Sequence, residues 1–379
     1  MDLYKRLRTR EVLHPAWHKV RESGYKPSSS EKTRNLVRQF DANWLRNLER
    51  IRAKLKDQSF SFTGETGVLV PKGKGKFGVR PLVIAPIENR IVRRGILEVL
   101  QGYGANSEHR QRRWPGVPAV REIMSTRTSV GGISERGVPH GLALIDNAVR
   151  NGDHWFVRSD IRNFFTRIPK SDVTSFIRSA VADDQFADLF EVALATNLAN
   201  RDELEERQLF KLFPDPEVGV AQGSALSALA GNIALRDFDA RMNGRGIVCI
   251  RYIDDFILLG SSETKVHAAY RSARRMLCAM GMDVYDLTDL EARKSGKVDA
   301  GDIYDGTDVL GYRISGLARQ PCSAACRKFL EKLDKVVKDA KREMNLAAQG
   351  ASTSHNERYY QSMVTVSYTH LTLPTKRIV

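Results

Sequence analysis

Two adjacent aspartates, Asp254 and Asp255, lie between two apolar runs, and this arrangement constrains the fold more than any other feature of the sequence. The runs at residues 247–250 and 256–259 predict two buried strands joined by a tight turn. Two carboxylates at such a tip repel each other and lose hydration unless a cation compensates them. Mg²⁺ is the natural cation, because it prefers carboxylate oxygen and bridges to phosphates. The alternative is a solvated turn between two strands.

A third acid follows an upstream run with the character of a strand. Residues 155–160 read Trp-Phe-Val-Arg-Ser-Asp and end at Asp160, which Ile161 and an aromatic pair follow. Between the two acidic sites, residues 219–227 form a glycine-flanked turn that contains Gln222 and Gly223. This turn leads into a predicted helix of small residues over 225–235.

The order of acid-ended strand, Gln-Gly turn with helix, and Asp-Asp hairpin resembles the palm domain of reverse transcriptases. Residues 80–84 with Arg90 precede these blocks, and residues 309–312 follow them. The resemblance covers roughly residues 60–345. It implies an α+β right-hand polymerase fold, with fingers, a palm built on an antiparallel sheet with helices, and a partial helical thumb. It also implies an RNA-directed DNA polymerase, a nucleotidyltransferase that adds dNTPs to a primer 3′-hydroxyl.

The resemblance assigns the catalytic and metal-binding roles to the three acids. Asp160, Asp254 and Asp255 would hold two Mg²⁺ ions, with the backbone carbonyl of Ile161 as a further ligand and Mn²⁺ as an alternative ion. In the two-metal mechanism, one ion activates the primer hydroxyl and the other stabilises the leaving pyrophosphate. For Asp160 the alternative is a purely structural role such as a helix cap.

Several residues are expected to bind the incoming dNTP. Phe165 occupies the position that in this family abuts the sugar 2′ carbon, where a large ring would exclude a 2′-hydroxyl. Core packing is the alternative for Phe164 and Phe165, but on an extended chain the two rings point in opposite directions, so one can be core and the other gate. Gln222 and Gly223 match the nucleotide-binding turn of the family.

A lysine-glycine segment at residues 72–76 precedes Arg80. Its glycines give backbone freedom and its lysines give charge, so we expect Lys72, Lys74 and Arg80 to contact the triphosphate. The spacing is not that of a P-loop. A solvated basic loop is the alternative.

Weaker signals concern the primer and the leaving group. By the same resemblance, Tyr252 would lie near the primer terminus, and Gly311 and Tyr312 match the primer grip, although a strand that ends in Gly-Tyr is common. Lys294 falls where the family often has a lysine near the pyrophosphate. Lys297 competes for that assignment, and a solvated lysine is the alternative for both.

The positive charge of the chain is concentrated at its N-terminal side. The net charge is +15, and residues 1–120 hold 25 Lys/Arg against 11 Asp/Glu, a balance of +14. This asymmetry indicates a phosphate-facing lobe attached to a nearly neutral core. The chain has no apolar run of transmembrane length, and its four scattered cysteines are too few for a disulfide framework. We therefore expect a reduced, cytoplasmic protein without a membrane partner.

The expected organisation has five parts. They are a basic helical region (1–60), fingers (61–150), a palm (151–315, with fingers and palm helices in 161–235), a partial thumb (316–365) and a tail (366–379). The tail resembles translated read-through of a sequencing adapter, so we expect a poorly ordered, non-native segment there. A genuine C-terminal strand is the alternative, because Val, Tyr and Thr favour strands.

Other functions fit the sequence less well. An RNA-dependent RNA polymerase shares the palm but usually has Gly-Asp-Asp at the hairpin, so Tyr252 and Phe165 favour reverse transcription. An RNA-binding protein with an inactive palm would have no reason to keep three acids. The chain has little room beyond fingers, palm and thumb, which favours a stand-alone retron or anti-phage defence enzyme. Ala221, where intron-derived enzymes often have proline, argues against a group II intron origin.

The expected partners are an RNA template, a DNA or RNA primer and dNTPs, with a dedicated non-coding RNA and an effector protein as further partners. The identity of the template, the priming mode and the oligomeric state stay open on the sequence alone.

Overall fold

The computed structural model describes residues 2–26, 29–71, 78–102, 114–133 and 136–348. The expected triphosphate contacts Lys72 and Lys74 and the tail at 366–379 lie outside these residues. The chain divides into two compact units, Met1–Asp302 and Ile303–Val379, and each is described by itself. The expected boundaries at residues 60, 150 and 315 stay predictions.

Four helices form the N-terminal region, as the sequence predicts. They are α1 (Leu3–Leu7), α2 (Arg10–Tyr25), α3 (Glu31–Asp41) and α4 (Trp44–Lys56). The Ser30 hydroxyl caps α3 by accepting a hydrogen bond from the Thr33 amide. Helix α2 packs along α5 (Ile87–Gln101) and buries Trp17 completely. This packing joins the basic N-terminal helices to the next segment of the chain.

A two-stranded hairpin precedes α5. Strands β1 (Thr66–Pro71) and β2 (Val79–Ile84) pair antiparallel, with Val70 opposite Arg80. The hairpin places Arg80 on an exposed strand.

Helices then alternate with loops up to the main sheet. They are α6 (Pro118–Ser125), α7 (Val138–Arg150), α8 (Lys170–Ala180), α9 (Asp184–Leu194), α10 (Arg201–Glu206), α11 (Ser227–Ala234) and α12 (Arg236–Met242), with 3₁₀ turns η1 (Phe164–Arg167) and η2 (Phe210–Leu212). The predicted small-residue helix over 225–235 is α11. Helix α7 begins at Val138 and has Pro139 in its first turn, where proline is favourable.

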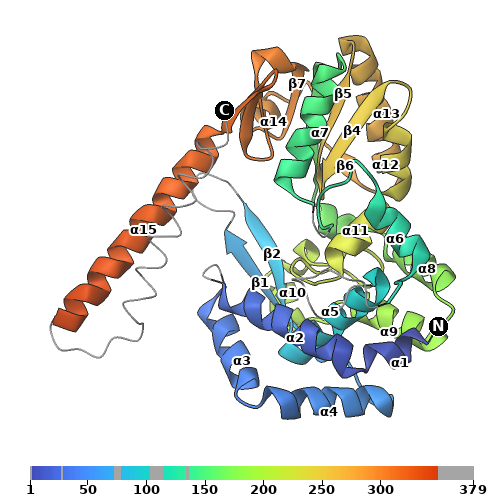
Figure 1. Cartoon of the computed structure of the whole chain (residues 1–379), viewed down its shortest axis with the longest axis vertical. Helices are drawn as coiled ribbons and strands as arrows, with labels where there is room; N and C mark the ends of the chain where they lie inside the picture. Colours follow the sequence, from blue (N-terminus) through green and yellow to red (C-terminus); the bar gives the residue numbers. More distant parts are fainter. Residues whose placement is uncertain (1, 27–28, 72–77, 103–113, 134–135, 349–379) are drawn as a thin grey trace. The chain divides into compact units, whose positions relative to one another are not determined.

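The main sheet has five strands, which are β3 (Trp155–Arg162), β4 (Ile247–Tyr252), β5 (Asp255–Gly260), β6 (Asp283–Val284) and β7 (Val298–Asp302). Its order is β4-β5-β3, and β3 pairs on its other edge with β7 and then β6. All of these pairs are antiparallel. Helix α13 (Glu263–Ala279) contacts β3 and β5, and α14 (Leu290–Lys294) precedes β7. Figure 1 shows this sheet with α7, α12 and α13 around it, away from the N-terminal helices.

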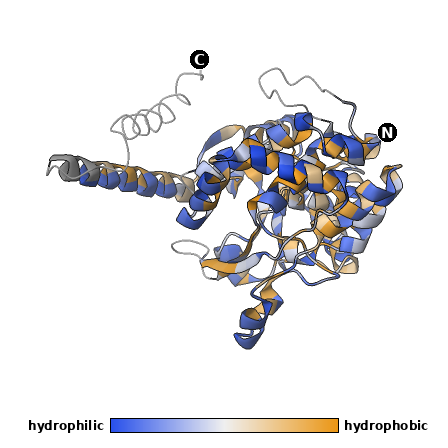
Figure 2. Cartoon of the chain, turned by 90° about the horizontal axis from the view of Figure 1, so that it is seen from below, coloured by the Kyte–Doolittle hydropathy of each residue, from blue (hydrophilic) through white to orange (hydrophobic). Residues whose placement is uncertain are grey.

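The second unit contains a small sheet and a long helix. Strands β8 (Thr307–Val309), β9 (Tyr312–Ser315) and β10 (Ala318–Pro321) form an antiparallel meander after the turn η3 (Ile303–Asp305). Helix α15 (Ser323–Ala348) lies within residues 316–365, which the sequence analysis assigns to a partial helical thumb. Along α15, hydrophobic residues alternate with hydrophilic ones (Figure 2).

The expected α+β fold class is confirmed by this antiparallel sheet and its surrounding helices. The large core consists of the apolar faces of helices packed on the sheet, with Val157, Phe238 and Leu258 among its fully buried members. In the part of the chain that the structure describes, no helix is both long and apolar enough to span a bilayer. The cysteines at 249, 278, 322 and 326 are all free thiols.

Candidate active site

The two adjacent acids lie at the tip of the β4–β5 hairpin. Tyr252 pairs with Asp255, so that Ile253 and Asp254 are the two central residues of the turn. Ile253 has a φ of 62°, a conformation that β-branched residues rarely adopt. A positive φ at the first central position belongs to the tight turns that match the twist of a hairpin. The strained isoleucine therefore fixes the direction in which the acids leave the sheet.

The third acid lies on the neighbouring strand. Asp160 of β3 is directly opposite Asp255 in the register, and cross-strand partners project from the same face of a sheet. The amide of Ile161 donates a 3.0 Å hydrogen bond to the carbonyl of Asp254. Strand β3 continues to Arg162, so Asp160 lies inside the strand rather than at its end. Strand pairing thus brings together three acids that are 94 and 95 positions apart in the sequence.

The acids influence each other electrostatically. Desolvation by the surrounding protein, followed by the charges of Asp254 and Asp160, raises the pKa of Asp255 to about 6. This happens even though Asp255 keeps an exposed edge, because the protein around it still displaces much of its hydration. The pKa of Asp254 is also raised, first by desolvation and then by the charge of Asp160. Burial is the larger cause of both shifts, and the neighbouring carboxylates add to it.

One lysine partly compensates this charge. The ammonium group of Lys297, just before β7, forms an ion pair with Asp160 Oδ2. Burial acts to lower the pKa of Lys297, but the hydrogen bond and charge of Asp160 outweigh this and raise it. Lys294 instead pairs with Glu291 at 3.6 Å and is 74% exposed. Of the two competing lysines, the structure brings Lys297 to the acids.

The donor chemistry of the site fits a hard divalent cation. Asp160 Oδ1 is buried and has no hydrogen-bond partner, which leaves a carboxylate oxygen available. Within the described ranges, however, no three His, Cys, Asp or Glu side chains are gathered closely enough to hold an ion. The backbones of Asp160 and Asp255 are paired in the sheet, whereas the side chain of Asp160 accepts a hydrogen bond from the Lys297 amine. The three aspartates therefore fit Mg²⁺ by residue type and by position in the sheet. The Asp160 side chain is oriented toward Lys297.

A buried arginine, which the sequence analysis did not identify, supports the hairpin. Arg251 is 1% exposed, and its guanidinium donates hydrogen bonds to both carboxylate oxygens of Asp239, at 2.8 and 2.6 Å. It also donates to Asn232 Oδ1 at 2.9 Å and to the Ser129 hydroxyl at 3.0 Å. A further bond of 2.7 Å reaches the carbonyl of Ile253 in the strained turn. The sequence signal was present, since a charge inside an apolar strand requires a buried partner.

The loop before α7 reinforces the same turn. The amide of Val130 donates to the Arg251 carbonyl at 2.8 Å, and the Arg251 amide donates to Thr128 at 3.0 Å. A Cβ at Gly131 would lie 2.3 Å from the amide nitrogen of Ile253. Only glycine permits this close approach of two backbones. The loop and the Arg251 side chain therefore both contact the turn at Ile253.

The aromatic pair after Asp160 differs from the extended geometry expected for it. Asn163 has a φ of 50°, and Phe164 and Phe165 begin the 3₁₀ turn η1. The expected alternation of an extended chain is therefore wrong here. The two rings still separate, because Phe164 is buried against Gly231 whereas Phe165 is only half-buried at the edge of the core.

The Gln-Gly turn lies beside this aromatic turn. The amide of Val220 donates to the Phe165 carbonyl at 2.7 Å, and Gly219 donates to Ile168 at 2.8 Å. Gly223 has a φ of 105°, which the sequence satisfies with glycine. The Gln222 carbonyl accepts a 3.3 Å hydrogen bond from Val83 of β2. The turn thus links the palm segment to the β1–β2 hairpin.

Arg80 and the primer residues complete the expected set. The charge of Arg80 lowers the pKa of Asp254, and this is the smallest of the effects on that carboxyl, of which desolvation is the largest. Tyr252 is half-buried beside the turn. Gly311 and Tyr312 belong to the second unit, in which Gly311 has a φ of 87° and accepts a hydrogen bond from Cys322. Their role as a primer grip stays a prediction.

Comparison with known proteins gives a consistent result. Residues 70–286, more than half of the chain, match a family model described as "Reverse transcriptase (RNA-dependent DNA polymerase)". The protein YkfC of Escherichia coli (strain K12) is 25% identical over 183 residues, which cover 47% of this chain and 40% of that protein.

Similar solved structures include two kinds of assembly. A chain of a partial Cas6-RT-Cas1–Cas2 complex is 21% identical with a TM-score of 0.39, over 74% of this chain and 43% of that one. Apo telomerase from Candida tropicalis is 12% identical with a TM-score of 0.44, over 70% of this chain and 49% of that one. The chain spans less than half of the length of YkfC and of both solved chains.

Proposed function

The chain belongs to the reverse transcriptase family, and on that premise we propose that it is an RNA-directed DNA polymerase whose active centre is formed by Asp160, Asp254 and Asp255. The observation that carries this proposal is the pairing of Asp160 opposite Asp255 at a strained hairpin tip. Such a concentration of carboxylates, of which Asp160 forms an ion pair with Lys297, favours cation binding.

Each residue has a separate role in the proposed reaction. The three carboxylates and the Ile161 carbonyl would hold two Mg²⁺ ions, or Mn²⁺ in their place. These ions supply activation of the primer hydroxyl and charge stabilisation at the leaving pyrophosphate. Lys297 neutralises Asp160 in the metal-free protein, so the acids do not have to separate to relieve their repulsion.

The substrate-binding residues lie around this centre. We assign Arg80 to the triphosphate, because its charge already acts on Asp254. Lys72 and Lys74 would join it from the loop that follows β1. Gln222 and Gly223 would contact the nucleotide from the turn next to β2. Phe165, half-buried beside that turn, would exclude a 2′-hydroxyl by its size.

Primer extension tests the proposal directly. The protein should add dNTPs to a DNA primer annealed to RNA when Mg²⁺ is present, and addition should stop on chelation. Asp254→Asn should retain binding of the primer–template while it loses incorporation. Preferred use of NTPs over dNTPs would instead indicate an RNA polymerase, and binding without incorporation by the unmodified protein would indicate an inactive palm.

The biological setting is a separate part of the proposal. We infer a bacterial enzyme of retron or anti-phage defence type, because Ala221 stands before the Gln-Gly turn where intron-derived enzymes often have proline. A dedicated non-coding RNA and an effector protein would be its partners. Its free cysteines suit a reducing compartment such as the cytoplasm. Sequencing of the nucleic acid that co-purifies with the protein and its flanking genes would identify the template, and an intron RNA would contradict this setting.

A further inference from the structure

The acidic centre, formed by Asp160, Asp254 and Asp255, has a cation of its own. The Lys297 ammonium forms an ion pair with Asp160 Oδ2, on the residue that the sheet places opposite Asp255. The Lys297 side chain is 40% exposed and the Asp160 side chain 11%, so the pair lies at the edge of the protein interior. A lysine in this position shares its carboxylate with any cation that enters the centre.

The backbone keeps this lysine at the centre. The Asp160 amide donates a 3.3 Å hydrogen bond to the Lys297 carbonyl, which extends the pairing of β3 with β7. The Lys297 amide in turn donates a 2.7 Å hydrogen bond to the carbonyl of Ala292 in α14. Because both polar backbone groups of Lys297 are held, its ammonium stays within reach of Asp160 at a high effective concentration.

An aromatic ring also attracts the ammonium. Tyr285 follows Val284, which pairs with Ile161 of β3. The Lys297 ammonium lies 5.8 Å from the centroid of the Tyr285 ring, within the range of a cation–π contact. The backbone of Tyr285 is itself fixed, because its carbonyl accepts a hydrogen bond from the hydroxyl of the buried Tyr270. The ring and the carboxylate therefore both determine where the ammonium lies.

An ion pair and a metal ion make opposite demands on Asp160. Its Oδ2 accepts a hydrogen bond from Lys297, whereas its Oδ1 is buried without a hydrogen-bond partner. A divalent ion that binds Oδ1 would share one carboxylate with the ammonium, and two cations so close together repel each other. An ion that takes both oxygens would have to break the ion pair. In either arrangement, the lysine lowers the affinity of the centre for divalent ions.

We propose that Lys297 is an internal counter-ion that lowers the affinity of the acidic centre for Mg²⁺ and Mn²⁺, and that Tyr285 is the residue that positions it. The inference rests on the proposed function in one respect, because it takes the three aspartates as the metal-binding residues. Lys297 thus sets the concentration of divalent ion at which the centre fills. This role is distinct from contact with pyrophosphate, since it operates before any nucleotide binds.

The test measures metal binding without nucleotide or nucleic acid. Mn²⁺ is the probe, because the free ion is counted by its electron paramagnetic resonance signal, and Mg²⁺ is then added in competition. Lys297→Gln should raise the affinity for Mn²⁺ about tenfold, because it removes a charge-assisted hydrogen bond that competes with the ion. Lys297→Arg keeps the charge and should leave the affinity within about twofold of that of the unmodified protein.

Two substitutions of Tyr285 test its positioning role. Tyr285→Leu removes the aromatic ring and should raise the Mn²⁺ affinity about twofold to fivefold, because the ammonium loses one of its two attractive contacts. Tyr285→Phe retains the ring and should restore the affinity of the unmodified protein. Equal affinities of Tyr285→Leu and the unmodified protein would exclude the positioning role.

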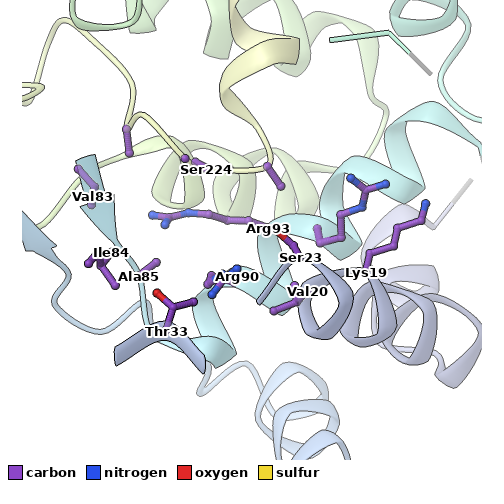
Figure 3. Close-up of a pocket in the computed structure, with 14 residues that line it drawn as sticks. Lys19, Val20, Ser23, Thr33, Val83, Ile84, Ala85, Arg90, Arg93 and Ser224 are labelled. Carbon is purple, nitrogen blue, oxygen red and sulfur yellow. The ribbon is translucent and has the colours of Figure 1, made fainter. Parts of the chain in front are cut away.

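Two other lysines provide matched controls. Lys19 lines a cavity of about 310 Å³ between α2, α5, the end of β2 and the Gln-Gly turn (Figure 3). Its side chain is 37% exposed and pairs with Glu98 at 2.6 Å, so Lys19→Gln removes a lysine of similar exposure from a similar ion pair. Lys294→Gln removes the exposed lysine three positions before Lys297. Each control should change the Mn²⁺ affinity by less than about twofold, because these lysines pair with Glu98 and Glu291.

A double substitution separates competition for Asp160 from a general effect of charge. On the Asp160→Asn background, Lys297→Gln should raise the Mn²⁺ affinity by less than about twofold, because the ion pair is already absent. The same tenfold rise on both backgrounds would show that the lysine acts only through its charge at a distance, and would overturn the proposal. A rise of the same size in Lys294→Gln would overturn it in the same way.

Failure of this inference is distinguishable from failure of the proposed function. If Asp160→Asn binds Mn²⁺ as tightly as the unmodified protein, the aspartates are not the metal site and both proposals fail. If Asp160→Asn weakens Mn²⁺ binding while Lys297→Gln has no effect, only the role of Lys297 fails. Thermal melting shows whether each variant is folded. Lys297→Met, a second neutral side chain of similar length, carries the test if Lys297→Gln does not fold.

Discussion

Two regions of the β4–β5 hairpin handle charge in opposite ways, although they are three residues apart. The first region, which we call the base, is Arg251 with its buried partners just behind the turn. The Arg251 guanidinium donates hydrogen bonds to the Asp239 carboxylate, and Asn232 and other polar groups accept its remaining hydrogen bonds. At the tip, Asp255 lies opposite Asp160, Asp254 is its neighbour in the turn, and Lys297 forms an ion pair with Asp160. The base is neutral and closed, whereas the tip keeps excess negative charge and a carboxylate oxygen without a partner.

This difference separates charges that hold the fold from charges that bind a ligand. A buried pair that satisfies its own hydrogen bonds contributes to a unique arrangement, and it needs nothing from outside. Charged side chains that lack an opposite charge in the folded protein are instead candidates for binding an ion or a charged ligand.

The largest effect is expected from the tip. Asp254→Asn should lower dNTP incorporation more than about a hundredfold, because the carboxylate would hold the Mg²⁺ ions that stabilise the negative charge developing in the reaction. Primer extension under single-turnover conditions measures this loss. The matched control is Asp283→Asn, the same chemical change at an exposed acid on β6, which should retain near-normal activity. If both variants lost activity equally, the special status of the tip would be refuted.

Substitution of Arg251 at the base should lower the free energy of unfolding. Arg251→Met leaves Asp239 buried without its partner, so we expect the free energy of unfolding to fall by about 3–5 kcal/mol. Urea unfolding followed by circular dichroism measures this change. Arg241→Met, at an exposed position of α12, should change stability by less than about 0.5 kcal/mol. A stable Arg251→Met protein would show that the base network does not hold the hairpin.

The aromatic turn offers a matched pair of substitutions. Phe165→Ala should reduce discrimination against NTPs by about tenfold to a hundredfold, because the 2′-hydroxyl would no longer meet the ring. Phe164→Ala should instead lower the free energy of unfolding by about 3–5 kcal/mol, since that ring is buried. Competition assays with mixed dNTPs and NTPs measure the first effect. Unchanged discrimination in Phe165→Ala would remove the ring from the proposed sugar filter.

The smallest effect is the pH dependence of the tip. Because the folded-state pKa of Asp255 is raised to about 6, the folded protein holds this proton more tightly than the unfolded chain does. The metal-free protein should therefore gain stability as the pH falls through 6, and lose that gain as the pH rises. Mg²⁺ needs the ionised form, so its dissociation constant should rise by up to about tenfold per pH unit below 6. Calorimetric titration with Mg²⁺ between pH 5 and 8 measures this, and an affinity independent of pH would contradict it.

Much of the local structure could be predicted from the sequence. The apolar runs on both sides of Asp254 predicted both strands and the turn, and the recurring apolar residues of the first 60 positions predicted helices. The local conformation at Phe164 was not predicted, because a left-handed Asn163 starts a 3₁₀ turn that apolar patterning does not signal. The choice of Lys297 over Lys294 also needed the structure, since both are lysines in the same short segment.

The sequence by itself determined the chemistry: the three acids, the Gln-Gly turn and the excess of positive charge before residue 120 are fixed by residue type and order. Tertiary structure alone decided which of these charges meet. Strand pairing placed Asp160 opposite Asp255, and packing enclosed Arg251 with Asp239. The physical reason is that charge compensation depends on distances between residues far apart in the chain, and only the folded packing sets those distances.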